Sequence, residues 1–196
     1  MQKIVPRDAT LIPDNATKVF EGEIFDVFQW PQTLYDGSSA TFEMLRRPDT
    51  TSVICVVDDT VLVLDEEQPG RGKRRSFPGG RVDPEDVDII ASAQREVQEE
   101  TGYQFKNWRL IKVWQPVAKI EWFIHLVLAW DVLSAGDTNH DAGEKILVEQ
   151  LTFEQLKPLV MDHVGYLGES AEFFEGVDTL AAILDTPHFL GRQVDR

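Results

Sequence analysis

The chain has 196 residues, with 19 lysines and arginines against 34 aspartates and glutamates, which gives a formal net charge of −15 at pH 7. A charge of this sign repels phosphate backbones and anionic lipid headgroups, so the composition argues against nucleic-acid and membrane partners. The hydrophobic fraction of 42% is that of an ordinary globular protein, and the length suffices for one hydrophobic core, with room for a small appendage.

Cysteine content and hydropathy point to a reducing compartment. Cys55 is the only cysteine, which excludes an intrachain disulfide and a cysteine-based metal cluster. It lies in the apolar run 52–57, a setting that favours a buried thiol over a nucleophile. Residues 1–14 lack the apolar segment of a signal peptide, and the longest apolar stretch, 122–130, is about half as long as a membrane span. We therefore expect a soluble cytoplasmic protein.

The first third of the chain is rich in strand formers. Residues 19–30 favour a strand, and residues 33–45 predict a hairpin that turns at Asp36-Gly37. Pro48, in the polar segment 46–49, interrupts this pattern. Two more strands are predicted at 52–57 and 61–65, with a turn at 58–59 between them, and a loop is predicted at 67–75.

After Gly80 the hydrophobic period changes from that of strands to that of a helix. Asp83 is a suitable N-cap and Pro84 suits a first helical position, so a helix is predicted from Pro84 to Thr101. Val87, Ile90 and Val97 would form its core face, and Gly102 would end it.

The remainder of the chain is predicted to alternate strands and helices. The expected strands are 108–114, 122–131 and 146–150, the expected polar loop is 134–144, and the expected helices are 153–160 and 171–184.

Three glutamates lie close together in the last turns of the predicted 84–101 helix. At about 100° per residue, Glu96, Glu99 and Glu100 fall within one arc of its surface. The helix dipole disfavours negative charge at this end, and the carboxylates repel one another. A solvated helix face is one interpretation. A hard divalent cation such as Mg²⁺, which prefers carboxylate oxygens, is the other.

A basic segment precedes the helix and favours the second interpretation. Five of the 19 basic residues, with no acid among them, fall within eleven positions: Arg71, Lys73, Arg74, Arg75 and Arg81. In so acidic a chain, this segment predicts an anion site next to a metal site. Ion pairs with acids elsewhere in the chain are the alternative.

Residues 80–103, GRVDPEDVDIIASAQREVQEETGY, resemble the Nudix box. Its second half is matched at every specified position: Arg95, Glu96, Val97, Glu99, Glu100, Gly102 and Tyr103. Its first half departs from the pattern, because Arg95 comes one residue late counted from Gly80 and Val87 stands where a glutamate is expected. Either Asp86 or Glu85 takes that role after a one-residue insertion, or the role is lost.

The resemblance implies a fold, a chemistry and a set of roles. The fold would be an α/β/α sandwich with a mixed β-sheet in residues 49–196, preceded by a small β unit in residues 1–48. The chemistry would be hydrolysis of a nucleoside diphosphate linked to another group, with Mg²⁺ or Mn²⁺ as cofactor. Glu96, Glu99, Glu100 and the carbonyl of Gly80 would hold the metal, and Arg95 would orient a glutamate.

Residues outside the box resemble the ADP-ribose pyrophosphatase branch of the family. Ser76-Phe77-Pro78-Gly79-Gly80 is similar to a segment of that branch, and Pro116 and Glu121 lie near corresponding positions. The implied reaction converts ADP-ribose to AMP and ribose 5-phosphate, and another nucleotide sugar such as GDP-mannose is the alternative. Arg71, Arg74, Arg75 and Arg81 would contact the substrate.

The same branch implies a homodimer in which N-terminal strands reach the partner's site. Trp30 or Phe28 would then stack on the base, and Arg47 or Arg46 would contact a phosphate, although a core or interface role is open for each aromatic. Glu144, with Asp141 as second choice, is the candidate general base. Two other functions stay open: a nucleotide-sensing module without turnover, and hydrolysis of nucleoside triphosphates.

Overall fold

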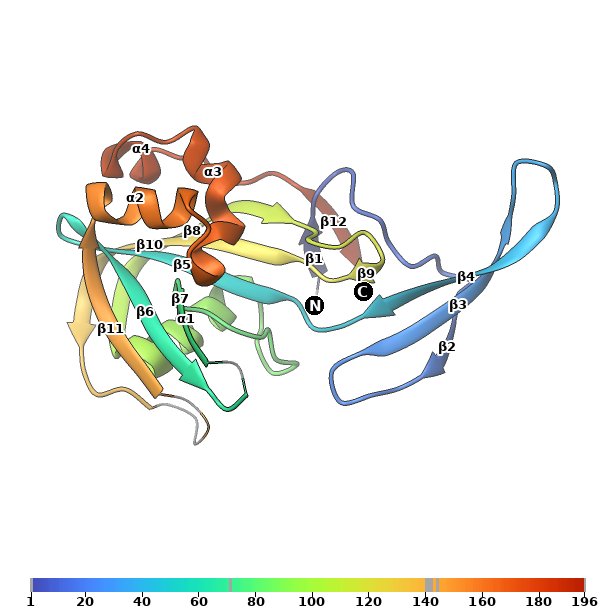
Figure 1. Cartoon of the computed structure of the whole chain (residues 1–196), viewed down its shortest axis with the longest axis horizontal. Helices are drawn as coiled ribbons and strands as arrows, with labels where there is room; N and C mark the ends of the chain where they lie inside the picture. Colours follow the sequence, from blue (N-terminus) through green and yellow to red (C-terminus); the bar gives the residue numbers. More distant parts are fainter. Residues whose placement is uncertain (1, 71, 140–142, 144, 196) are drawn as a thin grey trace. The chain divides into compact units, whose positions relative to one another are not determined.

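The computed structural model describes residues 2–70, 72–139, 143 and 145–195, and it divides into two compact units (Figure 1). Unit 1 comprises the described residues of 1–50, 113–124 and 191–196. Unit 2 comprises the described residues of 51–112 and 125–190.

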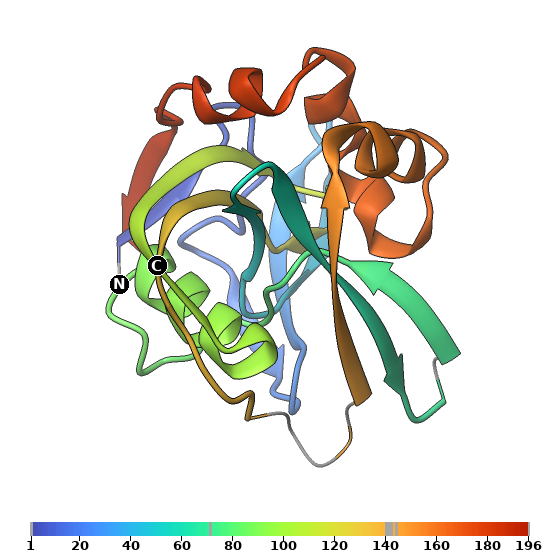
Figure 2. The same ribbon diagram turned by 90° about the vertical axis from the view of Figure 1, so that its left-hand side faces the viewer.

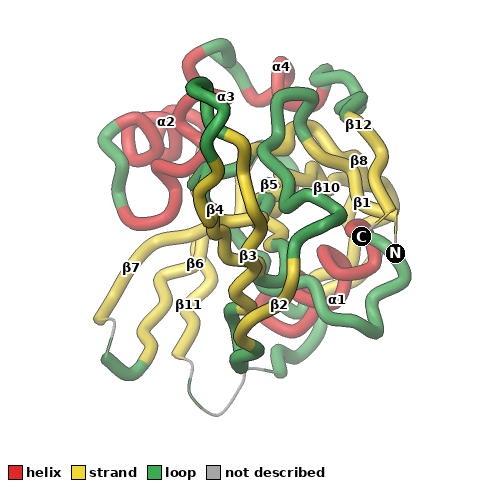
Figure 3. Tube along the Cα trace, turned by 90° about the vertical axis from the view of Figure 1, so that its right-hand side faces the viewer, coloured by secondary structure: helices red, strands yellow, loops and turns green. Residues whose placement is uncertain are grey.

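Unit 1 is built from two small sheets. In the first, the two ends of the chain pair antiparallel as β1 (Gln2–Val5) and β12 (Arg192–Asp195). The second has the order β2-β3-β4-β9, with bounds Thr17–Phe20, Asp26–Thr33, Ser39–Arg46 and Ile120–Glu121. Its first three strands are antiparallel, and β9 runs parallel to β4. Figure 3 shows β2, β3 and β4 side by side. Four buried side chains form the core on this sheet: Ile12, Phe28, Trp30 and Met44.

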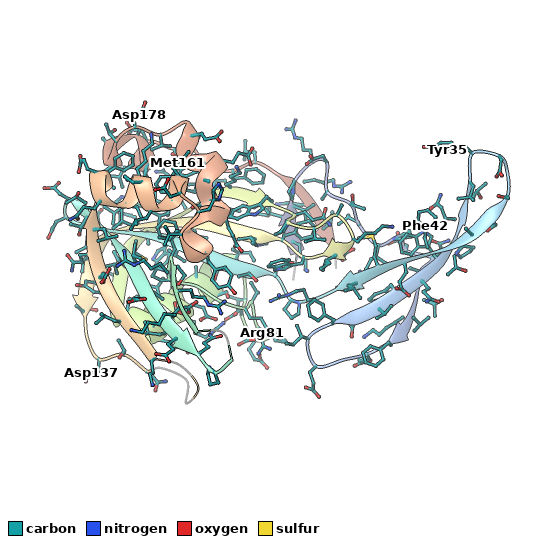
Figure 4. The ribbon with its side chains drawn as sticks, in the orientation of Figure 1. Tyr35, Phe42, Arg81, Asp137, Met161 and Asp178 are labelled. Carbon is teal, nitrogen blue, oxygen red and sulfur yellow. The ribbon has the colours of Figure 1, made fainter. Side chains whose placement is uncertain are left out.

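The predicted hairpin is present as β3 and β4. Its turn contains Gly37 at φ 83°, a conformation that glycine adopts without strain, and the Gly37 amide donates to the Leu34 carbonyl at 3.0 Å. The Asp36 carboxylate accepts from the Ser38 amide at 2.9 Å, which completes the turn. Tyr35 lies at the tip of the hairpin with its ring fully exposed (Figure 4).

Unit 2 is a six-stranded sheet with helices on both faces. The strand order is β11-β6-β5-β10-β8, and β7 also pairs with β6. Its strands are β5 (Thr50–Val57), β6 (Thr60–Gln68), β7 (Gly72–Ser76), β8 (Tyr103–Trp114), β10 (Ile124–Ala135) and β11 (Lys145–Thr152). The inner strands β5, β6 and β10 are apolar and buried over long runs, as expected for strands covered on both faces.

The helices of unit 2 lie on opposite sides of this sheet (Figures 1 and 2). One side carries α1 (Ile89–Thr101). The other carries α2 (Phe153–Met161), the 3₁₀ helix η1 (Gly165–Ser170), α3 (Ala171–Glu175) and α4 (Leu180–Leu184). This layered arrangement confirms the predicted mixed α/β fold. The described residues include no helix long and apolar enough to cross a bilayer.

The prediction of a loop at 67–75 is wrong. Strand β6 continues to Gln68, and β7 begins at Gly72 and pairs with it antiparallel. The register places Glu66 opposite Arg74 and Glu67 opposite Lys73. Opposite charges across two strands stabilise a polar ribbon that shows no hydrophobic alternation in the sequence.

The start of the box helix also differs from the prediction. Helix α1 begins at Ile89, and its N-cap is Asp88, whose carboxylate accepts from the Ala91 amide at 2.8 Å. Val87 therefore precedes the helix and is 80% exposed, whereas Val97 is buried as predicted. The segment before Asp88 folds as a turn instead. Gly102 ends the helix as predicted, at φ 72°.

The C-terminal region is more broken than predicted. Helix α2 matches its expected range, and its N-cap Thr152 forms a capping box with Gln155. The single helix expected at 171–184 is wrong, because the chain forms α3 and α4 with Gly176 ending the first. Val177 is buried between the two short helices in the chain, so the break places an apolar side chain in the core.

Candidate functional site

The three glutamates of α1 lie in different environments. Glu100 is buried at 8% exposure, the Glu96 side chain is 15% exposed, and that of Glu99 is 41% exposed. This gradient follows from the helix geometry, since Glu100 is nearest to the face that Val97 buries in unit 2. Of the three glutamates, only Glu99 therefore fits the interpretation as part of a solvated helix face.

Arg95 ties the glutamates to the turn before the helix. Its Nη1 donates to Glu96 Oε1 at 2.9 Å and to Glu99 Oε2 at 3.2 Å. Its Nε and Nη2 donate to the two carboxylate oxygens of Asp86 at 3.2 and 3.0 Å, and Nη2 also donates to the Arg81 carbonyl at 3.0 Å. A planar guanidinium with fixed donors suits this set of acceptors.

Asp86 is an acid of the turn before α1 that binds the Arg95 guanidinium. It contacts Arg95 with both oxygens, and it also accepts from the Asp83 amide at 2.8 Å. Glu85, the other residue considered for the role of the first box glutamate, is exposed.

Acidic groups outnumber basic groups in this cluster. Five carboxylates and two guanidiniums leave a formal excess of three negative charges, from Asp83, Asp86, Glu96, Glu99 and Glu100 against Arg81 and Arg95. Arg81 pairs with Asp83 at 2.9 Å. The positive charge present is therefore already shared among several acids.

Burial and ion pairing shift the pKa values of three groups in this cluster. Burial raises the pKa of Glu96 to about 7; the charges of Glu99 and Asp83 act in the same direction, and Arg95 opposes them. The hydrogen bond from Arg95 lowers the pKa of Asp86, and the same pair raises the pKa of Arg95. A bound cation would favour the ionised form of Glu96 and so lower its pKa.

Gly79 and Gly80 bring backbone against two of the glutamates. The Gly79 amide donates to Glu100 Oε2 at 2.7 Å. At Gly80, a Cβ would lie 2.7 Å from the Glu96 carboxylate atoms, so only glycine lets the backbone approach this closely. Gly79 has a φ of 140°, which side-chain-bearing residues rarely adopt.

The donor set fits a hard divalent cation in chemistry and in charge. Carboxylate oxygens and a backbone carbonyl are the ligands that Mg²⁺ prefers, and the cluster carries uncompensated negative charge. Within the described ranges, no three His, Cys, Asp or Glu side chains converge as metal ligands, since Arg95 lies between Glu96 and Glu99. The Gly80 carbonyl also accepts from the Thr51 amide at 2.8 Å.

Three of the basic side chains of the 71–81 segment have partners in unit 2. Arg75 pairs with Glu149 at 2.8 Å. Arg74 donates to the Tyr166 hydroxyl, and its guanidinium lies 4.8 Å from the centre of that ring. The alternative of ion pairs with acids elsewhere in the chain describes Arg75, whereas Arg81 pairs with Asp83, two residues further along. Arg71 lies outside the described residues.

A model of the NUDIX domain matches residues 46–167 of this chain. The chain belongs to the NUDIX domain family. The match contains α1 and the whole carboxylate cluster described above. It confirms the family that the box residues predicted.

Two further comparisons show proteins that are similar to this chain. The chain is 50% identical over 85 residues to the mitochondrial coenzyme A diphosphatase NUDT8 of Mus musculus, a match that spans 39% of this chain and 40% of that relative. The solved structure of an ADP compounds hydrolase resembles this fold with a TM-score of 0.66 at 19% identity, over 83% of this chain and 90% of that chain. The second likeness concerns the fold alone.

The residues proposed to contact a base or phosphate from the N-terminal region lie in unit 1. Trp30 and Phe28 belong to the core cluster of that unit. The Arg46 guanidinium lies over Phe28 at 4.5 Å and pairs with the buried Glu121 at 2.9 Å. Arg47 lies over the Trp122 ring at 4.6 Å. Trp30 precedes the matched NUDIX segment, and Arg47 is inside it.

The candidate general bases, Glu144 and Asp141, lie outside the described residues. The segment that leads to them is attached to the end of α1 in the NUDIX domain. The Gly136 amide donates to the Gly102 carbonyl at 2.9 Å, and the Asn139 amide donates to the Glu99 carbonyl at 2.8 Å. These bonds use helix-terminal carbonyls that lack partners within the helix.

Two contributors to the site were not found from the sequence. Thr51, only 1% exposed, contacts Gly80 from the start of β5, and Tyr166 of η1 contacts Arg74. Each lies far along the chain from the residue it contacts, so no local pattern indicates the pair.

Proposed function

We propose that this NUDIX protein is a metal-dependent pyrophosphohydrolase that cleaves the diphosphate of a nucleoside diphosphate linked to another group. The observation that carries the proposal is the carboxylate cluster of α1 with its excess of negative charge next to the Gly79-Gly80 turn. Such a cluster is stabilised by a divalent cation, and phosphate substrates reach carboxylates through such cations.

Glu96, Glu99, Glu100 and the Gly80 carbonyl would hold the cation, Mg²⁺ or Mn²⁺. When bound, it neutralises phosphate oxygens and lowers the pKa of a water molecule. Arg95 restrains the orientation of Glu96 and Glu99 through the shared donor Nη1, and its pair with Asp86 anchors the guanidinium. Glu144 is proposed as the general base that takes a proton from the attacking water.

The proposed substrate is an ADP derivative, with ADP-ribose first. The family support is the likeness to the ADP-ribose branch, together with relatives whose names refer to ADP compounds and to coenzyme A, itself a phosphorylated ADP derivative. Cleavage of ADP-ribose would yield AMP and ribose 5-phosphate. Coenzyme A is the second candidate because of the 50% identity to a coenzyme A diphosphatase. GDP-mannose stays the alternative outside this class.

The binding residues and the assembly are part of the same proposal. Arg71, Arg74, Arg75 and Arg81 would contact the phosphates, and Trp30 and Arg47 would contact the base and a phosphate in a homodimer. Arg74 and Tyr166 together offer a donor and a ring. We also propose a cytoplasmic location.

A substrate panel tests the proposal. ADP-ribose, coenzyme A, GDP-mannose and ATP are incubated with the protein, with and without Mg²⁺, and the products are separated by ion-exchange chromatography. We expect AMP from ADP-ribose in the presence of metal only. Pyrophosphate release from ATP would instead support triphosphate hydrolysis. Calorimetric binding of ADP-ribose without turnover would support a sensing module.

A matched pair of variants tests the role of the cluster. Glu99→Gln removes one carboxylate charge in the site, and Glu175→Gln makes the same change at an exposed position of α3. We expect the first to reduce turnover by about 10²-fold or more and the second to leave it unchanged. Equal turnover of the two variants would contradict the proposed mechanism.

A further inference from the structure

Thr51 is the residue of β5 that contacts the Gly79-Gly80 turn in unit 2. Its side chain is buried, with the residue only 1% exposed. The Thr51 amide donates to the Gly80 carbonyl at 2.8 Å, and the Val53 amide donates to the Pro78 carbonyl at 2.7 Å. The turn therefore runs along β5 as an additional paired segment.

The Thr51 hydroxyl contacts both backbone polar groups of one glycine. It accepts from the Gly80 amide at 3.4 Å and donates to the Gly80 carbonyl at 3.5 Å. Each contact is long, and the two act on opposite sides of the same Cα. Together with the backbone bond from Thr51, they restrain rotation of both peptide groups that flank Gly80.

The turn is confined from the other side by the glutamates of α1. A Cβ on Gly79 would lie 2.3 Å from the Thr51 carbonyl oxygen, while the Gly79 amide donates to Glu100 at 2.7 Å. A Cβ on Gly80 would lie 2.7 Å from the carboxylate of Glu96. The two glycines thus separate Thr51 from two of the carboxylates by backbone alone, and a shift of the turn would displace those carboxylates.

We propose that the Thr51 hydroxyl is a positioning group, which holds the Gly80 peptide groups so that Glu96, Glu100 and the Gly80 carbonyl keep the arrangement that binds a divalent cation. This inference rests on the proposed function, because it assigns the cation to this cluster. The inference assigns a role to Thr51, which lies on β5 outside the box and whose side chain is not itself a metal ligand.

Three variants separate the hydroxyl from the size of the side chain. Thr51→Val replaces the hydroxyl by a methyl group of similar volume, and Thr51→Ser keeps the hydroxyl and removes the methyl group. Thr60→Val is the matched control, because the Thr60 hydroxyl donates to the Val57 carbonyl at 2.8 Å at the opposite end of β5. Thr51→Ala carries the test if Thr51→Val does not fold.

The readouts are the dissociation constant of Mn²⁺ by isothermal titration calorimetry and the unfolding midpoint in urea with EDTA. We expect Thr51→Val to weaken Mn²⁺ binding about five- to tenfold, and Thr51→Ser and Thr60→Val to bind as the wild type does. Two-dimensional NMR of the metal-free protein should show faster amide exchange at Gly80 in Thr51→Val, and wild-type exchange in Thr51→Ser.

The outcomes distinguish this inference from the proposed function. If the wild type binds Mn²⁺ and Thr51→Val binds it equally well, the inference is wrong and the proposed function stands. If Thr51→Val and Thr60→Val lose unfolding stability and Mn²⁺ affinity alike, the effect is structural and the inference is wrong. If the wild type itself binds no Mn²⁺, the proposed function fails and the inference fails with it.

Discussion

Replacing Glu96 by glutamine should change how the stability of the metal-free protein depends on pH. Burial raises the pKa of Glu96 from 4.5 to about 7, so the folded protein holds a proton on this group at pH values where the unfolded chain has released it. The free energy of unfolding therefore falls as the pH rises from about 4.5 to about 7, because the folded state binds more protons across that interval. At pH values above that interval, the folded state carries the full free-energy cost of the ionised, buried Glu96 carboxylate.

The size of the effect follows from the shift. Each pKa unit corresponds to about 1.4 kcal/mol, so the ionised carboxylate costs the folded state up to about 3 kcal/mol at pH 8. Solvent screening reduces this value little, since the Glu96 side chain is only 15% exposed. Glutamine carries no charge at any pH, and its amide oxygen still accepts from Arg95. Glu96→Gln should therefore be more stable than the wild type at pH 8 and about equally stable near pH 4.5.

Urea unfolding in EDTA, followed by the fluorescence of the five tryptophans, measures this difference at several pH values between 4.5 and 8. Subtracting the unfolding free energy of the wild type from that of the variant removes the pH dependence that other titrating groups contribute to both proteins. Glu175→Gln is the control for loss of an exposed carboxylate. Added Mg²⁺ should raise the stability of the wild type at pH 8 and raise that of Glu96→Gln less. A difference that does not change with pH would refute the reasoning about burial and charge at Glu96.

Three other predictions concern the same cluster. Gly79→Ala should lower the unfolding free energy by about 2 kcal/mol or more in urea titrations, because its φ is 140° and its Cβ would overlap the Thr51 carbonyl; a loss below about 0.5 kcal/mol would contradict this contact. Arg95→Lys should lower turnover of ADP-ribose at least about tenfold in a product assay, because an ammonium cannot donate to Asp86, Glu96 and Glu99 in the same way; unchanged turnover would show that the guanidinium geometry is not needed. Removal of divalent cations with EDTA should abolish turnover reversibly, and activity that persists after dialysis against EDTA would argue against a metal-dependent reaction.

The sequence predictions were correct where the structure depends on adjacent residues and wrong where it depends on residues far apart in the chain. The hairpin at Asp36-Gly37 and the stop of α1 at Gly102 were predicted correctly, since both depend on the backbone preferences of a few adjacent residues. The N-cap of α1 was placed at Asp83 although Asp88 has that role. Both residues carry a carboxylate suited to capping, and the choice depends on Arg95, whose pair with Asp86 holds the preceding segment as a turn.

The basic segment shows the same limit at longer range. The segment 67–75 was predicted to be a loop and its basic residues to form an anion site, yet β7 pairs with the acidic end of β6, and Arg75 pairs with Glu149 of β11. The sequence of a single strand does not show which charges lie opposite it on the neighbouring strand. The partner of each arginine is set by sheet order and register.

By itself, the sequence determined the family, the mixed α/β class and the clustering of three carboxylates at the end of one helix, because helical spacing and the box pattern are properties of consecutive residues. Only the tertiary structure decided how those carboxylates differ. Glu96 and Glu100 are desolvated and Glu99 is partly exposed. The Gly79-Gly80 turn lies against Glu96 and Glu100, and Thr51 of the distant strand β5 contacts that turn. Desolvation and backbone contact depend on what packs against a residue, and packing brings together segments that no local pattern connects.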